Sequence, residues 1–235
     1  MPFPDTMSEI PQALVQLIEA HKTYALGHRS VEALRGVSLE MPRGGFVVLQ
    51  GPSGSGKTTL LNLIGGIDRP TSGRVLIEGR DIAALSDDVL SEFRSKKLGF
   101  IFQNFNLIPV LTAVENIEYP LLLQRVPRAE ALARALAMAD AIGLAGMGDQ
   151  RPSELSGGQC QRVAIGRALV TNPALVIADE PTANLDAATG QAIIDLMHQM
   201  RDRTGATFVI STHDPTIAHM AEMRFALHDG TLVNT

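Results

Sequence analysis

The sequence predicts an α/β fold in which strands and helices alternate around a phosphate-binding loop. The first observation is the stretch Gly51–Thr58, Gly-Pro-Ser-Gly-Ser-Gly-Lys-Thr, which matches the pattern G-x-x-x-x-G-K-[ST]. The second is a set of continuous apolar runs, such as residues 174–178, which are typical of parallel strands covered on both faces. The third is that polar residues follow several of these runs directly. They would lie at the edge where open α/β sheets bind ligands.

Each residue type in the loop suits the binding of phosphate. Glycines allow backbone N–H groups to converge on phosphate oxygens. Lys57 brings a positive charge to the β- and γ-phosphates, and the Thr58 hydroxyl can ligate Mg²⁺. Apolar residues at 46–49 predict a strand before the loop, and 59–64 predict a helix whose N-terminus points at the phosphates. A simple glycine-rich turn would leave the lysine, the threonine and both flanks unexplained. The candidate phosphate-binding residues are Gly51, Pro52, Ser53, Gly54, Ser55, Gly56, Lys57 and Thr58.

The first part of the chain predicts a small antiparallel sheet beside the nucleotide core. Strands are expected at 14–19, at 31–40 with an interruption at Gly36, and at 74–77. Turns are expected at 27–28, 42–45 and 71–73.

The rest of the chain predicts alternating strands and helices. Helices are expected at 85–95, at 128–143, from Ser156 to about 169, and at 189–203. Strands are expected at 98–102, 174–178 and 207–211, followed by a hairpin at 225–233 that turns at Asp229–Gly230. In the helix at 128–143, helical spacing predicts that a core is faced by Leu132, Leu136, Ala139 and Ile142. No regular helix or strand is predicted for residues 104–126, which mix apolar and polar residues and contain two prolines.

Composition narrows the class of protein. The chain has 235 residues and a formal net charge of −5, which argues against a broad nucleic-acid-binding surface. The single cysteine, Cys160, fits a cytosolic compartment. No apolar run approaches the roughly 18 residues needed to span a bilayer, and the N-terminus lacks the features of a signal peptide. Residues 1–12 are expected to form a loose tail.

Three side chains after buried strands are candidates for the chemistry. Asp179 would orient Mg²⁺, directly or through water, beside Thr58. Glu180 could orient or deprotonate a water that attacks the γ-phosphate. The alternative is that two acids merely end a strand in solvent. His213 follows the next buried strand and is a candidate contact to the γ-phosphate, although a lone histidine is more often structural.

A second anion site is predicted at Leu155-Ser156-Gly157-Gly158-Gln159. Two glycines at a helix start offer unobstructed N–H groups and the positive end of the helix dipole. One nucleotide need not touch both sites in one chain, so a head-to-tail pair of copies would bring each Ser156–Gly158 segment onto the other copy's loop. An ordinary glycine-capped helix is the alternative.

These motifs, taken together and in this order, resemble the nucleotide-binding subunits of ABC transporters along nearly the whole chain. The resemblance implies one domain over 1–235. A RecA-like core and an antiparallel β subdomain would occupy about 13–103 and 161–235, and an α-helical subdomain about 104–160. It also implies that Tyr24 stacks on adenine and that Gln103 joins Mg²⁺ and the attacking water to the helical subdomain. Further nucleotide contacts are implied for Thr59, Gln159 and Asp186. Two copies would enclose two ATP molecules with Mg²⁺.

The stretches 102–121 and 179–186 further resemble the lipoprotein-release and macrolide-export (LolD/MacB-like) group. That group works with four-span membrane subunits similar to the division protein FtsX. We therefore expect an ATPase that dimerises and powers a membrane transport or extraction complex. It is expected to bind no nucleic acid and to sit in the cytoplasm, on the inner face of the membrane, through such a partner. Part of the docking groove for this partner is expected at Phe105, Leu107, Ile108 and Leu111, with ordinary core packing as the alternative. Two alternatives stay open: a regulatory ATPase whose cycle moves no substrate, and a nucleic-acid-associated ATPase, which the acidic balance disfavours.

Overall fold

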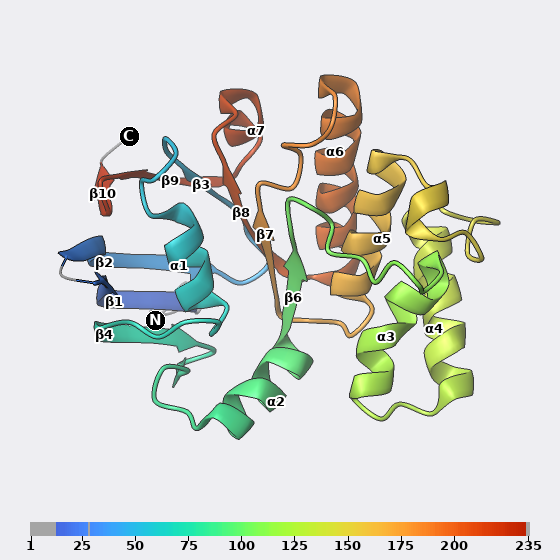
Figure 1. Ribbon diagram of the computed structural model, residues 1–235, viewed down its shortest axis with the longest axis horizontal. Helices are drawn as coiled ribbons and strands as arrows, with labels where there is room; N and C mark the ends of the chain where they lie inside the picture. The colour runs from blue at the N-terminus through green and yellow to red at the C-terminus, as the bar shows by residue number, and fades with distance from the viewer. Residues whose placement is uncertain (1–12, 28, 234–235) are drawn as a thin grey trace, which may run out of the picture.

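A central six-stranded sheet carries the fold in the computed structural model, which describes residues 13–27 and 29–233 (Figure 1). Its order is β10-β9-β3-β8-β7-β6, and all neighbours are parallel except the β9–β10 hairpin. This arrangement confirms the predicted α/β class and the predicted hairpin. The strands are β3 (Phe46–Gln50), β6 (Leu98–Ile101), β7 (Leu175–Asp179), β8 (Thr207–Thr212), β9 (Met223–His228) and β10 (Thr231–Val233).

A second sheet is antiparallel, as predicted, with the order β2-β1-β4-β5. It comprises β1 (Ala13–Leu26), β2 (Arg29–Pro42), β4 (Ser72–Ile77) and β5 (Arg80–Asp81). The prediction that Gly36 interrupts the strand is wrong. Gly36 stays within β2 at φ 73°, beside a shift in the β1–β2 register, so a bulge absorbs it. The turn predicted at 71–73 is also too long, because Ser72 already begins β4. The expected tail at 1–12, and His28 in the expected turn, lie outside the described residues.

Helices fill the space on both sides of the central sheet. They are α1 (Lys57–Ile64), α2 (Asp87–Lys97), α3 (Ala113–Leu123), α4 (Arg128–Ala141), α5 (Gly157–Leu169), α6 (Ala187–Thr204), the short α7 (Pro215–His219), and a 3₁₀ turn at Pro152–Glu154. Figure 1 shows α1 beside the antiparallel sheet, with α3, α4 and α5 gathered at the opposite end of the molecule. None of the helices in the described ranges is both long and apolar enough to cross a bilayer.

The central strands are buried on both faces, as their continuous apolar runs predicted. Val47 and Leu49 of β3 face a cluster formed with α1 and the antiparallel sheet. Phe46 and Val48 face a second cluster formed with α3–α6. Because successive side chains of a strand point to opposite faces, β3 ties both clusters together, and the loop that follows it starts from a fixed point.

Helix α3 was not predicted, because Pro120 lies inside it. A proline in a helix interior removes one hydrogen bond and costs about 3 kcal/mol. Here the cost is offset by packing, since Ile117 and Leu121 are fully buried, and by a capping box between Thr112 and Glu115. Tertiary contacts thus override the local signal.

The predicted core face of α4 is wrong for its two leucines. Leu132 and Leu136 are 41% and 48% exposed, whereas Ala131 and Ala135 are fully buried. Both sets recur at a spacing of four, so periodicity alone cannot choose between them. The small alanines let α4 pack closely against α3. Ala139 and Ile142 are buried, as predicted.

Paired glutamine substitutions test this orientation of α4. Ala135→Gln forces an amide into a filled core and should destabilise the fold by about 2 kcal/mol or more. Leu136→Gln, one residue along the same helix, should cost about 1 kcal/mol or less, because the position is half exposed. Denaturant unfolding of the two variants measures both values. Equal losses would contradict the observed face.

Candidate functional site

The phosphate-binding loop joins the end of β3 to the start of α1. Gly56 precedes α1 at φ 107°, and a Cβ there would lie 2.7 Å from the carbonyl oxygen of Ala33 in β2. Only glycine therefore fits between the loop and the antiparallel sheet. Ser55 is 2% exposed, and its hydroxyl has no hydrogen-bond partner among the described residues. A buried, unpaired donor in a loop of this kind suits a phosphate oxygen.

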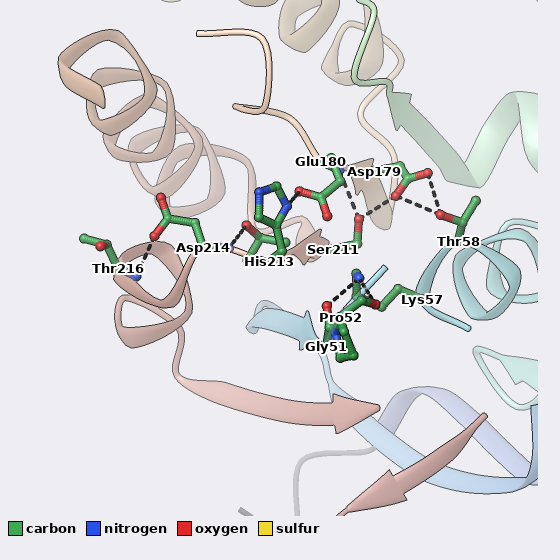
Figure 2. Close-up of polar contacts among 11 residues, drawn as sticks. Gly51, Pro52, Lys57, Thr58, Asp179, Glu180, Ser211, His213, Asp214 and Thr216 are labelled. Atoms are coloured by element: carbon green, nitrogen blue, oxygen red, sulfur yellow. Dashed lines mark hydrogen bonds and ion pairs between the residues drawn. The ribbon is translucent and has the colours of Figure 1, made fainter. Parts of the chain in front are cut away.

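Lys57 places its ammonium group at the loop. It is buried, and its Nζ donates to the carbonyl oxygens of Gly51 at 2.7 Å and Pro52 at 3.1 Å (Figure 2). Two neutral carbonyls do not neutralise an ammonium charge. An anion arriving at the loop would therefore gain a charge-assisted contact.

Thr58 and Asp179 form a pair of oxygen ligands beside the loop. The Thr58 hydroxyl donates to Asp179 Oδ2 at 3.1 Å, although α1 and β7 are far apart in sequence. A hydroxyl and one carboxylate are ligands that Mg²⁺ accepts when phosphates and water complete its shell. The residues present thus fit the predicted magnesium site.

Glu180 and His213 meet at the same edge of the sheet. His213 Nδ1 lies 3.0 Å from Glu180 Oε2 (Figure 2). The Glu180 side chain is 18% exposed and that of His213 67%. Glu180 has a left-handed backbone at φ 47°, a conformation that costs a non-glycine residue free energy. Such strain at a carboxylate in a cleft is typical of a functional position.

A cavity of about 790 Å³ brings most of the predicted residues together. Five residues of the phosphate loop, Gln103, both acids and His213 line it, along with residues that sequence analysis missed. Gly51, Pro52 and Ser55 of the loop do not line it. Most of the missed residues come from β2 and from the β9–β10 turn, which no sequence motif marks, and Ala183 lies between β7 and α6. The lining comprises Val31, Glu32, Ala33, Arg35, Ser53, Gly54, Gly56, Lys57, Thr58, Thr59, Gln103, Asp179, Glu180, Ala183, His213, Asp229 and Gly230.

The second predicted anion site is not part of that cavity. Ser156 is the N-cap of α5 in a reciprocal capping box with Gln159. This helix start packs against the start of α6, because Cβ atoms added at Gly157 and Gly158 would meet Leu185 and Thr189 at 3.3 and 2.6 Å. Asp186 is the N-cap of α6 and accepts a hydrogen bond from Thr189 N–H. The two helix starts therefore lie side by side, and neither Ser156 nor Asp186 lines the cavity of its own chain.

Tyr24 does not line the cavity either. Its hydroxyl donates to Asp68 at 2.8 Å, and the Lys22 ammonium lies 4.9 Å from the ring centroid. Burial and the bond to Asp68 raise the pKa of Tyr24. Burial raises the pKa of Asp68, but hydrogen bonds from Lys22 and Tyr24 outweigh it and hold that pKa below its usual value. Tyr24 is thus anchored through its hydroxyl, with Lys22 over the ring.

Comparisons with known proteins agree with this geometry. The family model described as ABC transporter matches residues 34–183. The lipoprotein-releasing system ATP-binding protein LolD of Myxococcus xanthus is 43% identical, over 93% of this chain and 97% of that protein. The macrolide export ATP-binding/permease protein MacB of Syntrophobacter fumaroxidans is 45% identical over 93% of this chain, which spans only 31% of that longer protein. A solved structure of the ATP-binding cassette MJ0796, dimeric and bound to ADP and Pi, is 43% identical with a TM-score of 0.86, over 94% of this chain and 97% of that one.

Substitutions at Tyr24 separate stacking from anchoring. Tyr24→Phe keeps the ring and loses the bond to Asp68, so it should lower the free energy of unfolding by about 1 kcal/mol and leave nucleotide affinity within about twofold. Tyr24→Ala should weaken nucleotide binding about tenfold, the loss expected when a ring of this kind no longer stacks on a base. Titration calorimetry and thermal unfolding measure the two effects. Unchanged affinity in the alanine variant would exclude stacking.

Proposed function

The chain belongs to the ABC transporter family of ATP-binding proteins and is an ATPase, and from this premise we propose that it is the subunit that powers a membrane complex. The observation that carries the proposal is the Glu180–His213 contact at 3.0 Å, in the cavity that also holds Lys57, Thr58 and Asp179. A carboxylate held by an imidazole beside a phosphate loop suits the activation of water next to a γ-phosphate.

The residues divide the work of hydrolysis. Lys57 and the loop N–H groups would bind the β- and γ-phosphates, while Thr58 and Asp179 would hold Mg²⁺. The metal ion, when bound, would neutralise charge that develops on the phosphates. Glu180 orients the attacking water and takes its proton, and His213 holds the Glu180 carboxylate in place. Gln103 lines the same cavity and is positioned to contact the water.

Two copies are proposed to pair head to tail around two ATP molecules. Ser156, Gly157 and Gly158 lie outside their own cavity yet offer a helix N-terminus suited to phosphate. The cassette MJ0796, similar along nearly the whole chain, is dimeric in its solved structure. A two-fold pair would place each Ser156 at the other copy's γ-phosphate.

The variant Glu180→Gln tests the pairing. It keeps the shape of the side chain but removes the base, so ATP should bind and turn over at least about a hundredfold more slowly, within the range of general-base catalysis. The protein should then sediment as a dimer with Mg-ATP and as a monomer with ADP. Adding Ser156→Arg should abolish the dimer and keep ATP affinity. A wild-type rate in Glu180→Gln would disprove the assignment of the base.

A membrane subunit is proposed to dock in a second cavity, of about 380 Å³, between α2, β6, α3 and α5. Its apolar lining includes Phe100, Phe102 and Leu123, and Arg94 and Arg167 also line it. None of the four residues expected from the sequence, Phe105, Leu107, Ile108 and Leu111, lines this cavity. They are half-buried in a loop that Asn116 fixes through its bonds to Ile108 and Leu111.

Arg167 links this groove to the catalytic cavity. Its guanidinium donates to the carbonyl oxygens of Phe105 at 2.8 Å and Asn106 at 2.5 Å, and both residues have left-handed backbones. Asn184 donates to the carbonyl of Gln103 in the same segment. A short apolar helix of the membrane partner, bound in this second cavity, would contact the segment 103–106, which begins at Gln103. These contacts support the proposal that force is transmitted to a transporter of the LolD and MacB kind, in which the chain would lie on the inner face of the membrane.

In the alternative function, a regulatory ATPase that moves no substrate, the membrane partner would bind in the same groove. The two functions would be distinguished by the external domain of that partner. We do not favour a nucleic-acid partner, since the net charge of −5 provides no basic surface overall.

Leu123→Asp tests the groove. Leu123 is 64% exposed, so the change should leave the fold and the basal ATPase rate unaltered, while the stimulation of hydrolysis by the co-expressed membrane subunit falls at least about tenfold, as for the loss of an interface anchor. Leu136→Asp, on the exposed face of α4 and outside the groove, is the matched control. Equal stimulation in both variants would place the docking surface elsewhere.

A further inference from the structure

Ser211 is a buried residue whose hydroxyl group bonds to both Asp179 and Glu180. It lies in β8, paired with Leu49 of β3 on one side and with Asp179 of β7 on the other. The residue is completely buried and does not line the cavity. Its Oγ donates to Asp179 Oδ1 at 2.5 Å and accepts the backbone N–H of Glu180 at 3.0 Å (Figure 2).

We propose that Ser211 is a positioning residue for the hydrolysis of ATP, which fixes the magnesium-binding carboxylate and the backbone of the catalytic base with one oxygen atom. The inference rests on the proposed roles of Asp179 and Glu180. Ser211 was not marked by any sequence motif, since a serine at the end of a buried strand carries no signal of its own.

The first half of the role concerns the Asp179 carboxylate. An aspartate χ2 torsion has a broad minimum, so an unsupported carboxylate rotates. Here Oδ1 is held by Ser211, and the Thr58 hydroxyl lies nearer to Oδ2, at 3.1 Å, than to Oδ1, at 3.4 Å. The oxygen expected to serve Mg²⁺ is thereby set next to the other expected ligand. Outer partners of this kind orient metal-binding carboxylates and raise metal affinity.

The second half concerns the strained backbone of Glu180. Its N–H is shared between the Ser211 carbonyl at 3.2 Å and the Ser211 hydroxyl at 3.0 Å. These bonds help to hold φ at 47°, the conformation from which the side chain reaches His213. With an apolar residue in place of Ser211, the Glu180 N–H would keep only its bond to the carbonyl of residue 211. Asp179 Oδ1 would also lose the hydroxyl group that holds it. Both losses act without touching the nucleotide.

The experiment compares Ser211→Ala, Ser211→Val and Ser211→Thr in the full chain. Valine and threonine have nearly the same shape, so that pair differs in the hydroxyl group alone. Calorimetry measures the affinity for the hydrolysis-resistant analogue AMP-PNP in EDTA and over a series of Mg²⁺ concentrations. Mg²⁺ should raise the affinity for AMP-PNP above its value in EDTA. The alanine and valine variants should need about tenfold more Mg²⁺ than the wild type to reach half of this increase, whereas their affinity in EDTA should stay unchanged. Ser211→Thr keeps the hydroxyl group, so its Mg²⁺ requirement should lie within about twofold of that of the wild type.

Controls separate this role from a structural one and from failure of the magnesium site. Thermal unfolding identifies the variants that are folded, and the valine variant decides where the alanine variant does not fold. A wild-type Mg²⁺ requirement in Ser211→Ala or Ser211→Val would overturn the role of Ser211. Thr58→Ala serves as the reference. If it also leaves the Mg²⁺ requirement unchanged, the proposed metal site is wrong, and not only the role of Ser211.

Discussion

The parallel pairing of β8 between β3 and β7 is the constraint on which the site depends. Leu49, Ser211 and Asp179 occupy one row across the three strands. Every predicted site residue at this edge lies in the row or starts within two residues of it. This holds for the phosphate loop, the two acids and His213. Side chains alternate along a strand, so a slip of one residue would turn Asp179 to the opposite face. Apolar clusters on both faces of the sheet prevent such a slip, because each strand contributes to both.

The antiparallel sheet fixes the shape of the phosphate loop from the other side. Cβ atoms added at Gly56 and at Gly230 of the β9–β10 turn would each lie 2.7 Å from the Ala33 carbonyl oxygen. The Gly230 N–H donates to the Ser55 carbonyl, and its own carbonyl accepts from the Arg35 N–H. Contacts among three segments distant in sequence therefore hold the loop in one shape. This preorganisation reduces the ordering that binding would otherwise require.

The sequence was most informative where one local pattern determines the outcome. The phosphate loop, the buried strands and the Ser156 cap are of this kind, since glycine, apolar and capping signals act within a few residues. Prediction failed where tertiary packing decides. Pro120 argued against a helix that burial of Ile117 stabilises, and in α4 the alanines rather than the leucines face the core. Ser211 and the lining residue Arg35 could not be found either, because their roles come from contacts across strands rather than from neighbours in sequence.

One further hydrogen bond connects helix α5, whose N-cap is Ser156, to the residue that follows the proposed catalytic base Glu180. Gln161 lies in α5 just beyond Ser156, is fully buried, and donates from Nε2 to the Pro181 carbonyl at 2.7 Å. Pro181 directly follows Glu180, whose backbone is strained and whose carbonyl accepts from the Ala183 N–H. A buried amide that loses its partner costs about 1–3 kcal/mol. A displacement of α5 must therefore carry the Pro181 carbonyl with it or break this bond. In a head-to-tail pair, the phosphate held at Ser156 by one copy would thus bear on Glu180 of that copy, which acts on the other nucleotide. The hydrogen bond between Gln161 and Pro181 would then be one link between the two proposed sites within each chain.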